Sequence, residues 1–308
     1  MPTLKVRTMP YLSYAPFHMA QQQGLFARQG VNVELIDMDA SAPVIPALAR
    51  GDLDVLPAVI SPAIFNAIAR GGDIRLVASI SELVTGGCTT TALVANRAVA
   101  DSGRLSRADG WKGLRIAGAR APFSQFLLDK ILQPLGVSAV ALQSIDVPEP
   151  LEGDTIRAGR ADVGLMTEPW LTRALAANEV VVWKPMQDVA PGFQYTVLLY
   201  GPTLLKTHPE LGQKFMVALL EAIRQFGAGK TPLNLDIVGT ATRLDRDLLS
   251  RACWPGLRAG AEVNTGGALE FQVWARKRGL VDQLLPLTAF HDARFTAFAQ
   301  RTVPARQQ

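Results

Sequence analysis

One short segment combines the residue types that bind a small anion. In Gly118-Ala-Arg-Ala-Pro-Phe-Ser-Gln125, Arg120 stands between a predicted strand, Leu114–Ala117, and a predicted helix. A planar guanidinium can hold a carboxylate or sulfonate at two points. Ser124 and Gln125 lie in the first turn of that helix, where N–H groups and a partial positive charge favour an anion. We therefore predict an anion site here, with a solvated loop arginine as the alternative.

Other candidate binding residues are aromatic, hydroxyl-bearing or acidic. They are expected mainly in loops after predicted strands: Tyr11, Ser13, Tyr14, Ser41, Ser61, Ser81, Phe123, Glu168 and Trp170. The tyrosines and Phe123 favour an organic, planar ligand over bare nitrate, although the tyrosines can equally roof the core. Ser61 precedes Pro62 and can cap a helix. Glu168 can accept a hydrogen bond from an amino group or heterocycle, or simply place negative charge at a helix N-terminus.

The sequence carries no recognisable catalytic or metal-binding signature. His18, His208 and His291 are dispersed, and there is no HExxH, P-loop, Gly-x-Ser-x-Gly or GxGxxG after the first strand. His18 lies on an apolar helix and is predicted to be a core or supporting residue. We predict that Cys88 and Cys253 are free, buried thiols, since they are far apart in sequence. No catalytic residue, metal or cofactor is expected.

Composition excludes several classes of protein. The chain has 308 residues, 48% of them hydrophobic and 19% charged, which is typical of a globular protein large enough for two lobes. Its net charge is +4, yet it contains no run of five basic residues. This excludes nucleic acid as the main partner and suits small anions. The longest uncharged stretch, 189–205, is interrupted by Pro and Gly, so no membrane span is expected.

The N-terminal sequence leads directly into a predicted strand at Leu4–Thr8, with no basic and apolar leader before it. No signal peptide is therefore expected in this chain. The protein either works in the cytoplasm or begins at a mature boundary.

Strands and helices alternate along the chain, which predicts an α/β fold with parallel sheet. The strands are expected at Leu4–Thr8, Val31–Ile36, Asp54–Ile60, Ile74–Ser79, Thr90–Ala95, Leu114–Ala117, Ala139–Ile145, Val163–Met166, Val180–Trp183 and Tyr195–Tyr200. From His208 onward the chain is expected to be mostly helical, with amphipathic stretches at 211–226 and 269–278.

The two halves of the chain repeat one pattern. Gly51-Asp-Leu-Asp-Val55 leads into a strand that ends at Ser61-Pro62. Gly159-Arg-Ala-Asp-Val163 leads into a strand that ends at Glu168-Pro169, at an offset of roughly 105–110 residues. This self-similarity predicts two lobes of the same βα design.

The chain resembles the type II periplasmic solute-binding proteins, and within them the nitrate/sulfonate/taurine branch that includes the thiamine-precursor (NMT1/THI5-like) binders. The resemblance rests on five segments that together span nearly the whole chain: Tyr11–Ala20, Gly24–Glu34, Ala47–Val55, Gly159–Trp170 and Trp274–Asp282. It implies a two-lobed α/β fold in which each lobe is a mostly parallel sheet flanked by helices. Lobe one would comprise 1–88 and 195–308, lobe two 89–194, and two crossings near 81–90 and 188–195 would form the hinge.

The same resemblance implies a monomeric substrate-binding component of an ABC importer. Such a protein captures a small organic solute, here a sulfonate, a carboxylate or a heterocycle, between its lobes by hinge closure and passes it to a permease. It would act in the periplasm or tethered outside the inner membrane. The alternative is a cytoplasmic enzyme on the same scaffold, of decarboxylase or menaquinone-pathway type. The cysteine cluster of the THI5 pyrimidine synthases is missing, and a regulator is disfavoured because no helix-turn-helix precedes Leu4.

Overall fold

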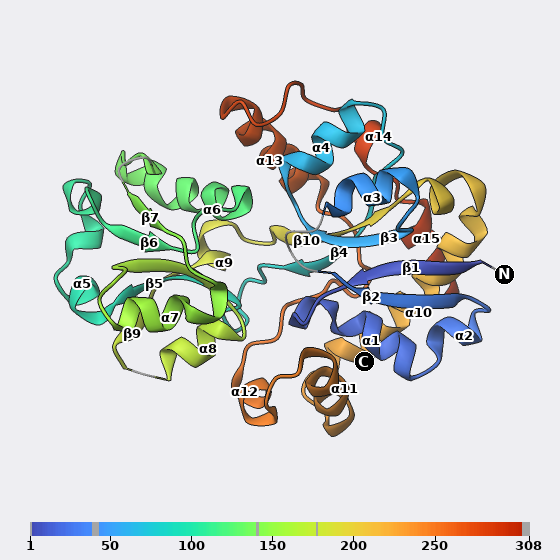
Figure 1. The fold of residues 1–308 in the computed structure, drawn as a ribbon, viewed down its shortest axis with the longest axis horizontal. Coiled ribbons are helices and arrows are strands. Elements are labelled where there is room, and N and C mark those ends of the chain that lie inside the picture. Colours follow the sequence, from blue (N-terminus) through green and yellow to red (C-terminus); the bar gives the residue numbers. More distant parts are fainter. Residues whose placement is uncertain (1, 39–42, 140–141, 177, 304–308) are drawn as a thin grey trace. The chain divides into compact units, whose positions relative to one another are not determined.

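The computed structural model describes residues 2–38, 43–139, 142–176 and 178–303. These residues form two compact units, both drawn in Figure 1. Unit 1 comprises 2–82, 194–246 and 256–303, and unit 2 comprises 83–193 and 247–255. Among the described residues no helix is both long and apolar enough to cross a membrane.

Unit 1 is built on one mixed sheet of five strands. They are β1 (Thr3–Thr8), β2 (Asn32–Asp37), β3 (Val55–Val59), β4 (Arg75–Glu82) and β10 (Gln194–Tyr200). Their order is β2-β1-β3-β10-β4, and β10 runs antiparallel to both of its neighbours. The other four strands share one direction, so their carboxyl ends lie at the same edge of the sheet.

Unit 2 repeats this topology with a second set of strands. They are β5 (Thr91–Asn96), β6 (Arg115–Ala117), β7 (Gln143–Ile145), β8 (Val163–Thr167) and β9 (Val180–Pro185). Their order is β7-β6-β8-β5-β9, with β5 antiparallel to both neighbours. The predicted fold class, two lobes each built on a mostly parallel sheet, is therefore confirmed.

The repeated sequence motif makes the same contacts in both sheets. Asp54 Oδ2 accepts a hydrogen bond from the backbone N–H of Lys5 at 2.8 Å, and the Asp54 N–H donates to the Lys5 carbonyl at 2.9 Å. Asp162 does the same with Arg115, at the same two distances. Each aspartate thus joins the start of β3 or β8 to the neighbouring strand, β1 or β6.

The Arg115 side chain adds an ion pair to the second copy of the motif, at 2.7 Å from Asp162. Burial acts to raise the pKa of Asp162, but the hydrogen bonds and positive charge of Arg115 outweigh it, so the pKa of this carboxyl is lowered.

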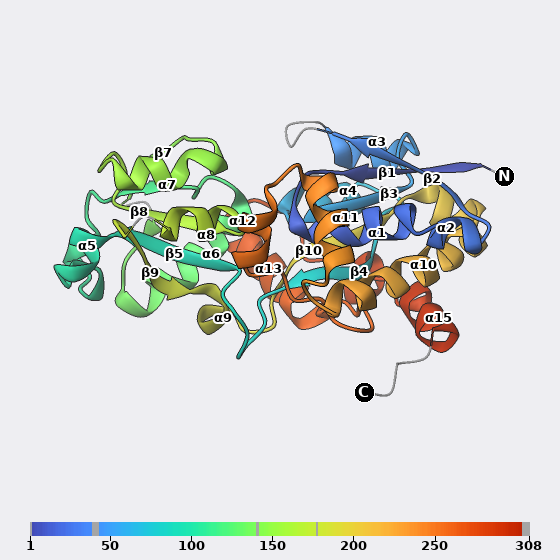
Figure 2. The ribbon, with the colours of Figure 1, turned by 90° about the horizontal axis from the view of Figure 1, so that it is seen from below.

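Helices cover both faces of each sheet (Figures 1 and 2). Those of unit 1 are α1 (Ala15–Gln22), α2 (Leu25–Arg28), α3 (Val44–Arg50), α4 (Pro62–Ala69), α10 (Pro209–Gly227), α11 (Pro232–Thr242), α13 (Thr265–Lys277), α14 (Leu287–Phe290) and α15 (Arg294–Thr302). Those of unit 2 are α5 (Arg97–Asp101), α6 (Pro122–Leu132), α7 (Glu149–Arg157), α8 (Trp170–Leu175) and α9 (Met186–Val189). A further short helix, α12 (Arg246–Arg251), begins at the last residue of a unit 1 segment.

Apolar residues at helical spacing explain how these helices bury one face. In α10, Leu211, Phe215, Leu219 and Phe226 are among the buried positions, as the predicted amphipathic stretch requires. In unit 2, buried residues of α7 and α8, such as Ile156, Leu171 and Ala174, pack with residues of the sheet in one cluster. These packed faces fix the loops that follow each parallel strand.

Cys88 and Cys253 form a disulfide, so the prediction of two free thiols is wrong. The sulfurs meet because residues 247–255 pack within unit 2, where the Cys253 N–H also donates to Glu168 Oε1 at 2.9 Å. The predicted assignment of all of 195–308 to lobe one needs the same correction. The chain therefore passes between the units four times instead of the expected two. The disulfide joins residues 165 apart and the hydrogen bond to Glu168 joins residues 85 apart, so neither contact left a local signal in the sequence.

Candidate functional site

Three loops of unit 2 leave the same edge of its sheet, because β6, β7 and β8 are adjacent and parallel. In open α/β sheets small molecules bind at this carboxyl edge. The loop after β6 carries Arg120, whose Nη1 donates to Asp146 Oδ2, in the loop after β7, at 2.6 Å. Both side chains are mostly exposed, at 65% and 78%. An exposed guanidinium at this edge can exchange its carboxylate for the anionic group of a ligand.

The N-terminus of α6 lies directly after Arg120. Ala121 occupies the N-cap position in an extended conformation and supplies no side-chain cap, and Pro122 begins the helix. Gln125 Nε2 donates to the Arg120 carbonyl at 3.2 Å, which holds the loop against the helix. The half-buried Ser124 hydroxyl makes no hydrogen bond to the described residues. The structure thus brings Gln125 into contact with Arg120, and Ser124 precedes Gln125 in the first turn of α6.

Phe123 belongs to an aromatic cluster in the same unit. Its half-buried ring stacks on Phe193 at 5.8 Å between centroids and lies 6.4 Å from Phe126. The ring thus packs beside the loop that carries Arg120.

Glu168 has structural partners for both carboxylate oxygens. Its Oε1 accepts hydrogen bonds from the Thr172 hydroxyl at 2.7 Å and from the Cys253 N–H, and Oε2 accepts from the Thr172 N–H at 3.0 Å. The side chain is 6% exposed. Glu168 therefore holds the first turn of α8 and the 247–255 segment, which fits the helix-terminus alternative.

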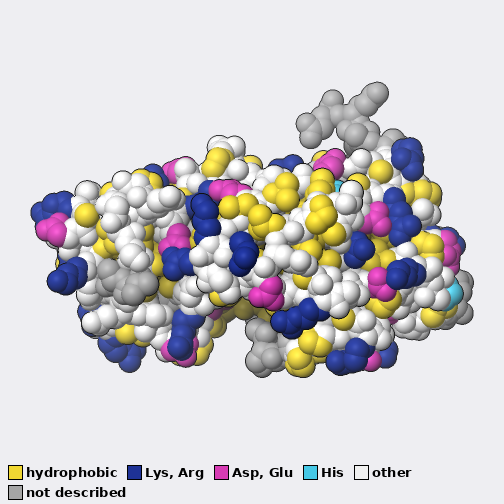
Figure 3. Space-filling view, turned by 90° about the horizontal axis from the view of Figure 1, so that it is seen from above, with side chains coloured by type: hydrophobic (Ala, Val, Ile, Leu, Met, Phe, Trp, Pro, Cys, Tyr) yellow, Lys and Arg dark blue, Asp and Glu magenta, His cyan; other side chains and the backbone are white. Residues whose placement is uncertain are grey.

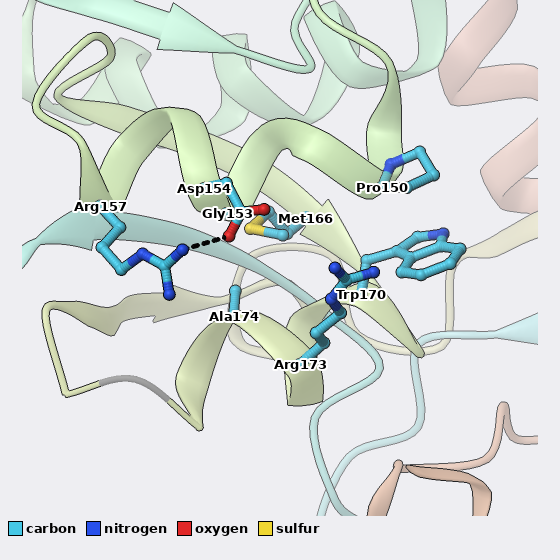
Figure 4. A pocket seen from close by; sticks show the side chains of 8 residues that line it. All are labelled: Pro150, Gly153, Asp154, Arg157, Met166, Trp170, Arg173 and Ala174. Carbon is cyan, nitrogen blue, oxygen red and sulfur yellow. Dashed lines mark hydrogen bonds and ion pairs between the residues drawn. The ribbon is translucent and has the colours of Figure 1, made fainter. Parts of the chain in front are cut away.

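Trp170 is one of the residues that line a small pocket between α7 and α8 (Figure 4). The pocket is lined by Pro150, Gly153, Asp154, Arg157, Met166, Trp170, Arg173 and Ala174. The Arg173 guanidinium lies 5.8 Å from the centre of the Trp170 ring, and Arg157 is paired with Asp154. The cavity volume of this pocket, about 20 Å³, has room for about one water molecule. This pocket is too small to hold an organic solute.

In unit 1, the predicted tyrosines differ in burial. Tyr11 is half-buried, whereas Ser13 and Tyr14 are buried. The Tyr14 hydroxyl donates to the Pro57 carbonyl at 3.0 Å and accepts from Arg7 at 3.5 Å. Burial raises the pKa of Tyr14 to about 12, although the charge of Arg7 opposes this. Tyr14 therefore roofs the core, and Tyr11 is the tyrosine with exposed ring surface.

The predicted serines also occupy different positions. Ser61 stands at the N-cap of α4 and is half-buried, but its hydroxyl does not cap the helix, which corrects that expectation. Ser81 is buried in β4 and accepts a hydrogen bond from the Thr196 N–H at 3.1 Å. Ser41 lies outside the described residues. Of the two that the structure describes here, Ser61 is partly exposed and Ser81 is not.

His18 shares a hydrogen bond with the Thr8 hydroxyl at 2.8 Å, at the end of β1. Burial lowers its pKa, with the charge of Asp37 acting in the opposite direction. This agrees with a supporting role. Among the described residues no group of three or more His, Cys, Asp or Glu side chains is arranged to hold a metal ion.

Three residues at these edges gave no signal in the sequence analysis. Asp146 pairs with Arg120, the buried Arg7 contacts Tyr14, and Glu152 is buried beneath the loop after β6. The sequence gives no reason to expect Glu152 to be buried, because on this helix the apolar neighbour Leu151 is the residue expected inside. In the structure Leu151 is 49% exposed and Glu152 only 4%.

The surface carries charges of both signs. On the face drawn in Figure 3, Lys and Arg side chains are interspersed with Asp and Glu. Exposed ion pairs of the described residues include Arg28 with Glu221 and Lys206 with Asp73. This agrees with the even charge distribution of the sequence.

Comparison with solved structures shows the same fold in transport proteins and in an enzyme. The ligand-binding component of an ABC-type import system from Staphylococcus aureus, with zinc bound, superposes with a TM-score of 0.76 at 15% identity, covering 98% of this chain and 100% of that one. The periplasmic aliphatic sulphonate binding protein SsuA from Escherichia coli superposes with a TM-score of 0.71 at 15% identity, covering 94% of this chain and 96% of that one. The desulfurization enzyme DSZB superposes with a TM-score of 0.69 at 12% identity, covering 98% of this chain and 99% of that one.

No curated protein matches the sequence at a significant level. The family model described as NMT1/THI5 like, however, matches residues 12–228, which is more than half of the chain. The chain therefore belongs to the NMT1/THI5-like family.

Proposed function

We propose that this protein is the solute-binding component of an ABC importer and that its solute is a small organic oxyanion, a sulfonate or carboxylate. The observation that carries this proposal is the exposed Arg120 guanidinium beside the N-terminus of α6, at the carboxyl edge of the unit 2 sheet. The guanidinium, the first-turn N–H groups and the Ser124 hydroxyl together supply the donors that an oxyanion needs. Heterocyclic solutes are the second class to test.

Other findings support this reading. Membership in the NMT1/THI5-like family and the fold shared with SsuA, named as a sulphonate-binding protein, are consistent with solute binding. The Cys88–Cys253 disulfide supports an oxidising compartment outside the cytoplasm. Closure of the two lobes on the solute remains a prediction, which small-angle X-ray scattering with and without solute would test.

An enzyme on this scaffold is the competing proposal, because DSZB shares the fold and is named a desulfurization enzyme. The two proposals differ in what happens to the solute. A carrier returns it unchanged after long incubation, whereas a lyase converts it. Chromatography of the recovered compound distinguishes them.

A thermal-shift screen of small anions and heterocycles tests the proposal directly. A compound that binds only the folded protein stabilises it by about 2.7 kcal/mol at a hundred times its Kd. We expect ethanesulfonate or benzoate to raise the Tm, and neutral analogues of the same size to leave it unchanged. Stabilisation by neutral heterocycles alone would move the proposal to the second class.

Arg120→Ala is expected to weaken oxyanion binding by about 2–5 kcal/mol, the range for losing one partner of a buried hydrogen-bonded charge pair, because the bound solute would cover the guanidinium. Stability should change by less than about 1 kcal/mol, because the pair with Asp146 is exposed. Arg120→Lys should recover only part of the affinity, since an ammonium cannot bind at two points. Titration calorimetry with the anion selected by the screen measures the effect.

Two further variants serve as controls for this experiment. Arg107 is as exposed as Arg120, at 65%, and is also paired with an aspartate of the same unit, so Arg107→Ala should bind normally. Asp146→Asn removes the carboxylate that competes with the solute and should strengthen binding. An Arg120→Ala variant with wild-type affinity would contradict the proposal and move the site to Tyr11 and Ser61.

A further inference from the structure

A buried carboxyl group lies against the loop proposed to bind the anion. Glu152 is on α7, and Gly118 follows the last residue of β6 with a φ of +73°. A Cβ placed on Gly118 would lie 2.6 and 2.9 Å from the two Glu152 carboxyl oxygens and 2.8 Å from the Leu165 carbonyl oxygen. Both oxygens of Glu152 therefore point at the carboxyl end of β6, and only glycine leaves room for them there.

This carboxyl group lacks a complete set of structural partners. Glu152 is 4% exposed, and its Oε2 makes no hydrogen bond in the described part of the chain. A buried polar atom without a partner is destabilising, so its retention calls for another explanation. The contrast with Glu168, whose two oxygens accept three hydrogen bonds, shows that this unit can satisfy a buried carboxylate.

The surroundings disfavour a negative charge on Glu152. Burial, together with the nearby charge of Glu149, raises its pKa to about 8. Among the elements packed against α7, β5 and β8 contain no charged residue, β6 contributes Arg115, β9 Lys184 and α8 Arg173. Arg115 is paired with Asp162, and Arg173 lies by the Trp170 ring. Near pH 7 Glu152 is therefore mainly a neutral carboxylic acid with one proton to donate.

We propose that Glu152 is a specificity residue for the oxyanion, donating a hydrogen bond from its carboxyl group beside Gly118 to an oxygen of the solute. The inference rests on the proposed function, since it assigns a further residue to the same site. A neutral acid can donate to an oxyanion, whereas its ionised form offers only acceptors and repels one. Glu152 would thus add an uncharged donor to the cationic donor Arg120.

The proposal predicts a pH dependence that Arg120 cannot produce. Because only the protonated Glu152 carboxyl can donate a hydrogen bond to the anion, the Kd for an anion should rise about tenfold between pH 7 and pH 9, as this carboxyl ionises. Ethanesulfonate and benzoate are suitable probes because their charge does not change in this range. Titration calorimetry of the full chain at pH 6, 7, 8 and 9 provides the measurement.

Glu152→Gln is the central variant. A glutamine has nearly the same shape, keeps an N–H donor and cannot ionise, so its affinity should vary less than about twofold from pH 7 to pH 9. At pH 9 it should bind the probe more tightly than the wild type does. Glu179→Gln changes an exposed glutamate of the same unit and should keep the full wild-type pH dependence.

The possible outcomes separate this inference from the proposed function. A Kd that depends on pH in the wild type and in Glu179→Gln, together with a Kd that stays nearly constant in Glu152→Gln, supports the oxyanion proposal and the role of Glu152. Binding with no change in Kd between pH 7 and pH 9, or with the same change in Glu152→Gln, overturns the role of Glu152 and leaves the oxyanion proposal standing. If neither probe binds at any pH, the oxyanion proposal fails and the role of Glu152 fails with it.

Discussion

Removing the Cys88–Cys253 disulfide is expected to lower the free energy of unfolding of unit 2 by about 2–5 kcal/mol. The bond joins residues 165 positions apart, so the reduced unfolded chain gains much conformational freedom. In the folded protein it also holds residues 247–255 in unit 2. The hydrogen bond from Cys253 to Glu168 would remain after reduction, but a single bond of this kind contributes less than the disulfide.

Urea unfolding followed by tryptophan fluorescence measures this effect selectively. Four of the five tryptophans belong to unit 2, namely Trp111, Trp170, Trp183 and Trp254. We expect the oxidised protein to unfold at a clearly higher urea concentration than the reduced one.

The double variant Cys88→Ser/Cys253→Ser is the matched control. It should resemble the reduced protein and should not respond to reductant, because the chain has no other cysteine. Equal urea midpoints for the oxidised and reduced proteins would show that the packing of 247–255, rather than the bond, determines the stability.

Replacing Glu152 by Gln is expected to change how stability depends on pH. The folded-state pKa is raised from 4.5 to about 8, so the folded chain keeps a proton that the unfolded chain releases above about pH 4.5. The raised pKa contributes its full stabilisation of the folded state below about pH 4.5. This contribution to the free energy of unfolding falls as the pH rises from there and is gone above about pH 8. The loss amounts to about 3–5 kcal/mol.

Glu152→Gln removes this loss because the amide stays neutral at every pH. The difference in free energy of unfolding between Glu152→Gln and the wild type should therefore grow from pH 5 to pH 8 and then level off. Urea titrations at unit pH intervals measure it, with Glu179→Gln as a variant whose difference from the wild type should stay near zero. A difference that is constant from pH 5 to pH 9 would mean that Glu152 is ionised throughout.

Much of the scaffold could be predicted because its signals are local. The strands expected at Val163–Met166 and Tyr195–Tyr200 match β8 and β10 to within one residue at each end, since a short apolar run defines each of them. The repeated Gly-x-x-Asp-Val motif predicted two similar lobes, and its two aspartates make equivalent backbone contacts. The cluster around Arg120 was also accessible, because its residues are neighbours in sequence.

The remaining features depend on contacts between distant residues. No residue near Cys88 in sequence indicates that it bonds to Cys253. Likewise, no residue near Glu168 indicates that its carboxylate accepts a hydrogen bond from the Cys253 N–H. The sequence predicts Tyr14 in a loop, yet its hydroxyl donates a hydrogen bond to the carbonyl of Pro57 in strand β3, 43 residues away. The exchange of burial between Leu151 and Glu152 reverses the rule that apolar side chains are inside, and the buried Glu152 carboxyl occupies space that Gly118 leaves open, 34 residues earlier in the chain.

The disulfide also determines how the molecule would carry a mechanical load. All five strands of the unit 2 sheet, from β5 to β9, lie between Cys88 and Cys253 in sequence. A force applied to the two ends of the chain is therefore transmitted through the sulfur–sulfur bond and bypasses that sheet. While the bond is intact, pulling can extend only the chain outside this covalent loop, and the loop that carries Arg120 keeps its fold under tension.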